Sequence, residues 1–306
     1  MINRTPVMTS RTLNTLVDAK VFLKCENFQR VGAFKFRGVS NKLLQLTDEE
    51  KKKGVITHSS GNHAQAVALA SLLLGIKSVI VMPKNAPQVK VEATKRYGAK
   101  IIRCANTVEA REKTCNDLMR KYGYTLVHPY DDEQIIAGAG TAAYELIKEI
   151  GPVDYMFCPI GGGGLTSGTS IATKALCPKA KMIAVEPKQA DDAYRSFQKK
   201  KLYPSTYPNT IADGLRTALS TNTFRIIQNN VDDIILVSEK EIVDAMKFLW
   251  TRMKIVVEPS GAVPVAGVFK MKKQIKNKTI GVIISGGNVD IDKFFQQYYH
   301  QIKKIK

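Results

Sequence analysis

The sequence predicts an α/β protein with two lobes, each built on an open, mostly parallel, twisted sheet covered by helices. Short runs rich in β-branched residues alternate with longer helical patterns, which is typical of parallel sheets. The chain has 306 residues, which is long for one core and sufficient for two. A compact series of strand–helix units also begins at residue 54 and ends near residue 130.

The individual elements follow from these patterns in chain order. Apolar, β-branched runs predict strands at residues 21–23, 54–57, 78–82, 100–103, 155–158, 181–185 and 280–284. Helical patterns occupy residues 36–46, 62–74 and 87–97, then a stretch to about residue 121, a stretch after Gly164, and an amphipathic end of the chain. The helix at 62–74 is rich in Ala and Leu, and the helix at 87–97 begins with proline.

The compact series of units predicts how the lobes divide the chain. We expect a small domain at residues 54–131, inserted into a large domain made of residues 1–53 and 132–306. No internal repeat or low-complexity linker interrupts either part.

Composition excludes several classes of protein. The net charge is +19, but the lysines are scattered and no nucleic-acid-binding signature occurs, so we expect no nucleic-acid partner. No apolar run is long enough to cross a bilayer, so we expect no membrane association. Five widely spaced cysteines argue against a disulfide framework or a structural zinc site and favour a reducing, cytoplasmic compartment.

One lysine stands between two aromatic residues. Lys35 lies between Phe34 and Phe36, in a segment bracketed by Gly32 and Gly38. A lysine in an apolar pocket loses its charge and can form a Schiff base as a neutral amine. Most lysines are solvated, so the segment by itself favours a surface lysine on a helix. The glycine-rich loops later in the chain reverse that judgement.

Four consecutive glycines, Gly161–Gly164, follow a strand and open a helix. Converging backbone N–H groups and the helix N-terminus make such a loop a phosphate site, with a flexible turn as the alternative. Thr169 stands where a P-loop requires lysine, and Thr166 occupies the third glycine position of a dinucleotide fingerprint. A phosphate other than that of ATP or NAD is therefore expected.

Two further loops carry polar groups. His58–His63 is a strand-to-helix loop whose hydroxyls and amides suit a carboxylate, although Ser60 or Asn62 alone would also serve as a helix cap. Ser285 follows the last strand, where it is placed either in a plain turn or against a ligand.

Glu186, Asp191 and Asp192 cluster after the strand at 181–185. Carboxylates with an intervening carbonyl suit a hard cation, whereas acids at a helix N-terminus are the common alternative.

Taken in order, these motifs resemble the fold-type II pyridoxal-phosphate enzymes, which have a fold similar to the tryptophan synthase β chain. The likeness is greatest to the serine racemases and serine/threonine dehydratases. It spans nearly the whole chain, from Arg4-Thr5-Pro6-Val7 to Asp290. The combination of the Phe34–Gly38 segment, the Ser59–His63 loop, the tetraglycine loop and Ser285–Asn288 is specific, although no single motif is.

The resemblance implies a role for each candidate residue. Lys35 would carry pyridoxal phosphate and act as the base on one face of the substrate, and Ser60 would act on the other face. The cofactor phosphate would bind to Gly161, Gly162, Gly163, Gly164 and Leu165; its ring would contact Phe34, Gly214, Asn62 and Ser285. The substrate would contact Ser59, Ser60, Asn62, His63 and Tyr130. Glu186, the Ala190 carbonyl and Asp192 would hold Mg²⁺, or Ca²⁺ or Mn²⁺, and the protein would form a homodimer.

The expected reaction is β-elimination. Ser285 is a neutral partner for the pyridine nitrogen, which favours prompt loss of a β-hydroxyl from L-serine or L-threonine, giving a 2-oxo acid and ammonia. Ser60 keeps serine racemisation open. Tyr130 and Ala33 depart from the serine racemase pattern and resemble a branch that includes threo-3-hydroxyaspartate ammonia-lyases, whose substrate would need an additional cation. A catalytically silent phosphate-ligand binding protein is the alternative from another class.

Overall fold

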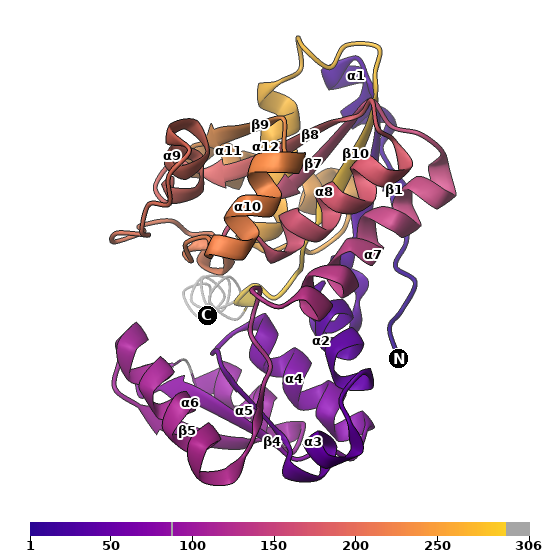
Figure 1. Cartoon of the computed structure of the whole chain (residues 1–306). Coiled ribbons are helices and arrows are strands. Elements are labelled where there is room, and N and C mark those ends of the chain that lie inside the picture. The colour runs from indigo at the N-terminus through magenta and orange to yellow at the C-terminus, as the bar shows by residue number, and fades with distance from the viewer. Residues whose placement is uncertain (87, 292–306) are drawn as a thin grey trace, which may run out of the picture.

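The computed structural model describes residues 1–86 and 88–291 and contains two sheets in two lobes (Figure 1). The predicted fold class is confirmed. The larger sheet has the order β1-β2-β10-β7-β8-β9, and the smaller has the order β5-β4-β3-β6. Among the described strands, β1 pairs with β2 in antiparallel orientation, and every other pairing is parallel.

The strands of the larger sheet are β1 (Val7–Thr9), β2 (Lys20–Cys25), β7 (Tyr155–Pro159), β8 (Lys181–Pro187), β9 (Asp233–Val237) and β10 (Thr279–Ile284). The strands of the smaller sheet are β3 (Val55–His58), β4 (Ser78–Pro83), β5 (Lys100–Cys104) and β6 (Thr125–Leu126).

The α-helices are α1 (Arg11–Val17), α2 (Lys35–Leu44), α3 (Asp48–Lys53), α4 (Asn62–Leu73), α5 (Gln88–Arg96), α6 (Val108–Tyr122), α7 (Glu133–Ile150), α8 (Gly164–Leu176), α9 (Asp192–Lys199), α10 (Thr221–Asn230), α11 (Glu239–Phe248) and α12 (Pro259–Lys270). Short helical turns are η1 (Glu26–Phe28), η2 (Arg30–Gly32) and η3 (Asp213–Leu215), and a π-helical turn, η4 (Leu249–Met253), follows α11.

Successive side chains along a strand of the larger sheet point to opposite faces, and each face packs in a separate hydrophobic core. Phe157 of β7 faces the core made with α1, α11 and α12. Its neighbours Met156 and Cys158 face the core made with α7, α8 and α10. Both faces of the sheet are therefore covered, as buried parallel strands require.

The smaller sheet is covered in the same way. Val55 and Ile80 pack with α4 and α5 on one face, and Ile56 and Val81 pack against Cys115 of α6 on the other. The first of these cores also contains Phe36 of α2, which lies outside residues 54–131. The four strands themselves fall inside that range. The domain boundaries at 53/54 and 131/132 stay a prediction.

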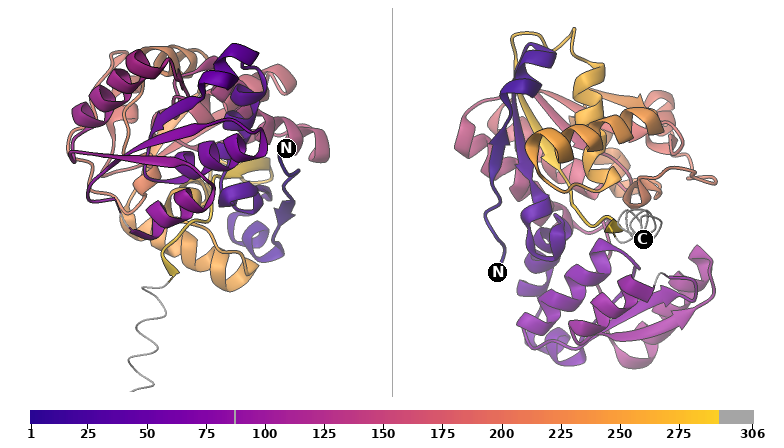
Figure 2. Two further views of the ribbon diagram at one scale, coloured as in Figure 1. Left: turned by 90° about the horizontal axis from the view of Figure 1, so that it is seen from below. Right: turned by 180° about the vertical axis from the view of Figure 1, so that it is seen from behind.

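Every predicted strand lies at the observed position, with ends that differ by at most two residues. Pro87 and the predicted amphipathic helix at the end of the chain fall outside the described residues. The N-terminal segment ahead of β1 runs along the side of the larger lobe toward α2, as seen from the front and from behind (Figure 1, Figure 2). Among the described residues, none of the helices has the length and apolarity to span a bilayer.

Candidate active site

Lys35 is the first residue of α2, and it faces the segment that follows β6. Its Nζ donates a hydrogen bond of 2.6 Å to the Pro129 carbonyl and lies 5.0 Å from the centroid of the Phe34 ring. Burial lowers the pKa of Lys35 to about 8. The residue is therefore much closer to a neutral amine at physiological pH than a solvated lysine, as the sequence predicted for an enclosed Lys35.

The start of α2 is attached to the end of β10. The Phe34 N–H donates to the Ser285 carbonyl at 2.9 Å, and Ala33 forms a bridge to Gly286. Ser285 is 4% exposed. Phe34, Lys35 and Ser285, which are distant in sequence, are thus brought to one place.

The tetraglycine loop joins β7 to α8. Gly163 has φ of +88°, a conformation that favours glycine. A Cβ atom on Gly162 would lie 2.5 Å from the ring of Tyr130, so a side chain there would displace the tyrosine. Leu165, which follows the loop, is buried in the core. The loop thus offers backbone N–H groups and a helix N-terminus without side chains, which is the arrangement that a phosphate requires.

Gly214 lies beside this loop. A Cβ atom on Gly161 would meet the Cα of Leu215 at 2.9 Å, so η3 packs directly on the first glycine. The Gly214 N–H donates to the Ser260 hydroxyl at 3.1 Å. The predicted ring contact of Gly214 therefore stands next to the predicted phosphate site.

The loop between β3 and α4 leaves a helix N-terminus open. Gly61 occupies the N-cap position, and no side chain caps α4 within the described part of the chain. Ser59 instead accepts from the Gly61 N–H at 3.3 Å. The simple capping alternative for Ser60 or Asn62 is not what this loop adopts, and the N–H groups of its first turn are left for a ligand.

His63 belongs to the core. It is 3% exposed, and its Nε2 donates to the Val127 carbonyl at 2.9 Å. Burial, followed by the charge of Lys35, holds the pKa of His63 well below its usual range. The imidazole is neutral and buried, so the backbone N–H of His63 is the group that can serve a substrate.

Asn62 is held from two sides by residues that sequence reasoning did not assign to the site. Its Nδ2 donates to Glu258 Oε1 at 2.9 Å, and its Oδ1 accepts from Asn288 Nδ2 at 2.9 Å. Asn288 lies in the loop after β10, and Glu258 is the N-cap residue of α12. Nothing in the sequence indicated that Glu258 would reach Asn62.

Tyr130 packs on the tetraglycine loop and next to His128. The His128 Nδ1 accepts from the N–H groups of Tyr130 and Asp131 at 3.3 and 2.8 Å, and the two rings lie 4.7 Å apart. Burial, followed by the His58 charge, lowers the pKa of His128 to about 4. Burial and then the Asp131 charge raise the pKa of Tyr130 to about 12. Both side chains are uncharged near neutral pH.

The acidic cluster after β8 contains two buried carboxyl groups. Glu186 is 1% exposed and accepts from the N–H groups of Ala193 and Tyr194 at 2.9 and 2.7 Å. Asp192 is 2% exposed, and its Oδ2 lacks a hydrogen-bond partner among the described residues. Ala190 is also buried, whereas Asp191 pairs with Arg195 at 2.8 Å. Glu186 thus fits the helix-terminus alternative, and Asp192 does not.

Burial is the main cause of a raised pKa at both carboxyl groups. Burial and then the Asp192 charge raise the pKa of Glu186 well above its usual range, and burial raises the pKa of Asp192 to about 6. Within the described residues, no three His, Cys, Asp or Glu side chains gather as a metal site would need. The predicted site differs from such a cluster, because it uses two carboxylates and a carbonyl.

The chain is similar to known proteins over nearly its whole length. The family model described as pyridoxal-phosphate dependent enzyme matches residues 1–286. A serine racemase of Schizosaccharomyces pombe is 49% identical over 293 residues, which are 95% of this chain and 91% of that protein. An L-threo-3-hydroxyaspartate ammonia-lyase of Saccharomyces cerevisiae is 48% identical over 294 residues, covering 96% and 90%. The solved structure of maize serine racemase has a TM-score of 0.96 and 44% identity, covering 99% of this chain and 94% of that one.

Proposed function

Since this chain belongs to the pyridoxal-phosphate dependent enzymes, we propose that it is an ammonia-lyase that eliminates water from a 3-hydroxy amino acid, with L-serine and L-threonine as substrates. The products are a 2-oxo acid and ammonia. The observation that carries this proposal is the arrangement of Lys35, at one end of α2, against the segment that packs on the tetraglycine loop.

The residues present suit the cofactor. The backbone N–H groups of Gly161–Gly164 would hold its phosphate, Phe34 and Gly214 would contact its ring, Asn62 would reach the ring hydroxyl, and Ser285 would meet the pyridine nitrogen. Bound there, pyridoxal phosphate withdraws electrons from the attached amino acid and so acidifies its Cα proton. Ser285 donates no charge to the ring, which weakens this withdrawal and favours loss of the β-hydroxyl over a long-lived carbanion.

Lys35 both holds the cofactor and moves a proton. Because the pKa of Lys35 is about 8, roughly one molecule in ten has a neutral Nζ at pH 7, far more than for a solvated lysine. The neutral Nζ can accept the Cα proton from one face of the substrate. When Nζ is protonated, the Pro129 carbonyl accepts a hydrogen bond from it.

The N-terminus of α4 would bind the substrate carboxylate. The uncapped N–H groups of Asn62 and His63, together with the hydroxyls of Ser59 and Ser60, would contact it. Tyr130, uncharged and packed on Gly162, would border the substrate on the opposite side.

A second substrate, L-threo-3-hydroxyaspartate, is supported by the placement of one cation. Burial is the main cause of the lowered pKa of His58, the residue that precedes Ser59; the Glu112 charge opposes the shift, and the charge of Arg111 on α6 adds to it. We propose Arg111 as the cation for the second carboxylate. Arg111→Gln should then abolish hydroxyaspartate turnover and spare L-serine, and Lys113→Gln, which removes an exposed charge on the same helix, serves as the matched control.

Serine racemisation is the other candidate, and Ser60 supports it. A proton must reach the face of Cα opposite Lys35, and the Ser60 hydroxyl lies in the carboxylate loop. If Ser60→Ala retains elimination and loses inversion, Ser60 is the second acid or base. Unchanged rates of both reactions would remove it from that role.

We also propose a divalent cation, Mg²⁺, Ca²⁺ or Mn²⁺, at Glu186, the Ala190 carbonyl and Asp192. The unpartnered Asp192 Oδ2 and the raised pKa of both acids support an oxygen-liganded cation.

We propose a homodimer as the assembly. A groove of about 470 Å³ runs between α7, α8 and α10, with Tyr144 and Ile171 about half exposed along it. Glu133 and Arg225 also line the groove, so the face carries both charges and can meet a second copy of itself. Light scattering of Ile171→Asp should give a monomer, whereas a persistent dimer would assign another face. The five free, buried cysteines suit a cytoplasmic location.

The decisive assay uses protein loaded with pyridoxal phosphate and Mg²⁺. Incubation with L-serine, D-serine, L-threonine and L-threo-3-hydroxyaspartate, each followed for keto acid and for enantiomer composition, separates the candidates. Keto acid from L-serine or L-threonine with little inversion supports the proposal. Rapid inversion would make the protein a racemase, turnover of hydroxyaspartate alone would restrict it to that substrate, and bound cofactor without any turnover would indicate a binding protein.

A further inference from the structure

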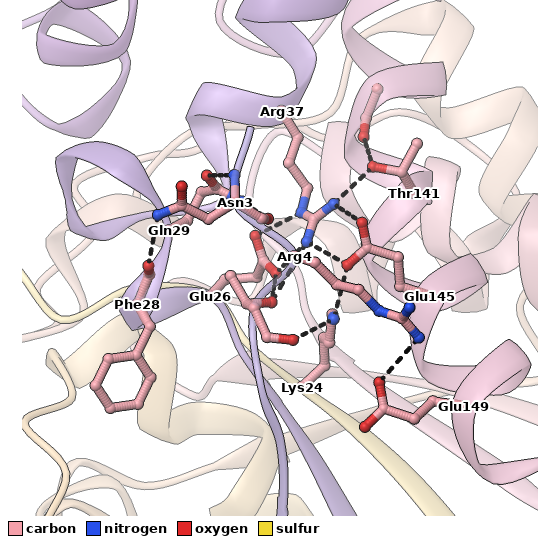
Figure 3. Close-up of polar contacts among 12 residues, drawn as sticks. Asn3, Arg4, Lys24, Glu26, Phe28, Gln29, Arg37, Thr141, Glu145 and Glu149 are labelled. Carbon is pink, nitrogen blue, oxygen red and sulfur yellow. Dashed lines mark hydrogen bonds and ion pairs between the residues drawn. The ribbon is translucent and has the colours of Figure 1, made fainter. Parts of the chain in front are cut away.

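A network of buried charges lies beside the first turn of α2. It consists of Lys24 of β2, Glu26 at the start of η1, Arg37 of α2, and Glu145 of α7 (Figure 3). The side chains of Lys24, Glu26 and Arg37 are 0% exposed, and that of Glu145 is 17% exposed. The two cations and two anions balance each other, which buried charges require.

Arg37 uses its guanidinium as two forks. Nε and Nη2 donate to the two oxygens of Glu26 at 2.7 and 2.9 Å. Nη1 and Nη2 donate to the two oxygens of Glu145, each at 2.8 Å. Paired contacts of this kind fix the plane of the guanidinium as well as its position, which a lysine cannot do.

Lys24 completes the network, and among the described residues it forms no hydrogen bond or ion pair with α2. Its Nζ donates to the Thr5 carbonyl at 2.6 Å and pairs with Glu145 at 2.7 Å. The N-terminal segment is thereby joined to β2 and α7. Figure 3 shows that Arg4 and Glu149 form a separate pair next to this network, 3.3 Å apart, and both of these residues are exposed.

Helix α2 contacts both lobes. Phe36, Val39 and Leu43 pack in the core of the smaller sheet. Arg37 points the other way, to β2 and α7 of the larger lobe. The helix also crosses α7 at two glycines, since a Cβ atom on Gly38 would lie 2.6 Å from the Ile135 carbonyl and one on Gly138 would lie 2.7 Å from the Arg37 carbonyl.

We propose that the forked ion pairs of Arg37 with Glu26 and Glu145 position Lys35, by fixing the first turn of α2 to the larger lobe that carries the tetraglycine loop and Ser285. This inference rests on the proposed role of Lys35 in holding the cofactor. Arg37 is a positioning residue, because it lies two residues beyond Lys35 and acts through the helix backbone. Without the two forks, only the backbone contacts with the end of β10 and the crossing with α7 would hold the first turn of α2 to the larger lobe, while its apolar face packs with the smaller lobe.

The test separates delivery of the Lys35 amine from formation of the phosphate site. Pyridoxal 5′-phosphate reports covalent capture through the rate at which its visible absorbance band forms on mixing with cofactor-free protein. Pyridoxine 5′-phosphate, which lacks the aldehyde, reports non-covalent binding through its Kd. We expect Arg37→Lys and Glu145→Gln to slow capture about tenfold or more, because small misplacements of a reacting group are costly, and to leave the Kd of pyridoxine 5′-phosphate within about twofold.

Two matched control variants separate an effect on the capture rate from an effect on folding stability. Lys24→Met removes a buried charge from the same network without touching α2, so it should lower the unfolding temperature but leave the capture rate unchanged. Glu149→Gln, one turn along α7 from Glu145, should change neither property.

The proposal is wrong if Arg37→Lys and Glu145→Gln capture pyridoxal phosphate at the parent rate, or if both variants lose analogue binding in proportion to capture. Failure of the proposed role of Lys35 would be distinguishable, because Lys35→Ala would then still form the band.

Discussion

Two buried charge clusters in this molecule have opposite character. The Arg37 network has two cations and two anions, and Arg37 forms complete forks with both carboxylates. Glu186 and Asp192 are equally buried but form no ion pair within the part of the chain that the structure describes, and each has a raised pKa. The first cluster is complete in the protein alone. The second needs either protons or a cation, which is how a ligand site differs from a structural one.

This difference predicts the largest loss of stability for Arg37→Met. Removal of one partner leaves Glu26 and Glu145 buried with only Lys24 to balance them, at a cost of about 3 to 5 kcal/mol in the free energy of unfolding. Denaturant titration measures this loss. A cost below about 1 kcal/mol would mean that the network is not the tightly coupled unit that its distances indicate.

For Glu186 and Asp192 we expect the stability of the fold to depend on pH, and this effect is the second largest after that of Arg37→Met. Because Asp192 has a pKa of about 6 in the folded protein against 3.8 ordinarily, the folded state binds that proton more tightly than the unfolded state. The contribution of Asp192 to stability should therefore fall by about 3 kcal/mol as pH rises from about 4 through 6, with Glu186 adding in the same direction. The lowered pKa values of His63 and His128 act in the opposite direction over this range, so the part that Mg²⁺ changes is the part that reports on the acidic pair. Thermal unfolding across this pH range, with and without Mg²⁺, is the measurement. Mg²⁺ should restore the lost stability at pH 7, and identical curves with and without the metal would argue against a cation at this pair.

Asp192→Asn tests whether the acidic pair, unlike the Arg37 network, needs a cation. The variant removes one of two repelling carboxylates, so the metal-free protein should be as stable as the parent at pH 7, or more stable. It should also lose most of the stabilisation by Mg²⁺, which for a site at 100 times its Kd is about 2.7 kcal/mol. Calorimetric titration with Mg²⁺ checks the binding. If binding survives in Asp192→Asn, the ion lies elsewhere.

The smallest effect is expected for the exposed pair next to the Arg37 network. Arg4 and Glu149 have side chains that are 68% and 39% exposed, and solvent screens such pairs. Glu149→Gln should change the free energy of unfolding by less than about 0.5 kcal/mol. Denaturant titration beside Arg37→Met measures it. A loss comparable to that of Arg37→Met would show that burial does not separate the two pairs.

The alternation of elements was sufficient to predict the fold, because buried parallel strands form apolar runs such as Ser78–Pro83 that helices must cover. Loops at strand ends were also visible in the sequence, since glycine and hydroxyl residues cluster where parallel strands finish. The polar partners of Asn62 could not be predicted in this way. Glu258 lies 196 residues away from Asn62, and only the crossing of the two lobes brings them together.

The Arg37 network was hidden for the same reason. Its contacts join residues that are 11 and 108 positions apart, and each charged residue alone is typical of a surface. The environment of Lys35 shows most clearly what the sequence alone could not predict. The two phenylalanines beside it were compatible with a solvated lysine, and the lowered pKa depends on burial by segments from another part of the chain.

The most direct test of the account is chemical trapping of the cofactor. Protein loaded with pyridoxal 5′-phosphate is reduced with borohydride, digested, and mapped by mass spectrometry. We expect the reduced cofactor to be attached to Lys35, and Lys35→Ala to lack both the label and turnover of L-serine and L-threonine. Stoichiometric labelling of another lysine, or parent-level turnover by Lys35→Ala, would contradict it.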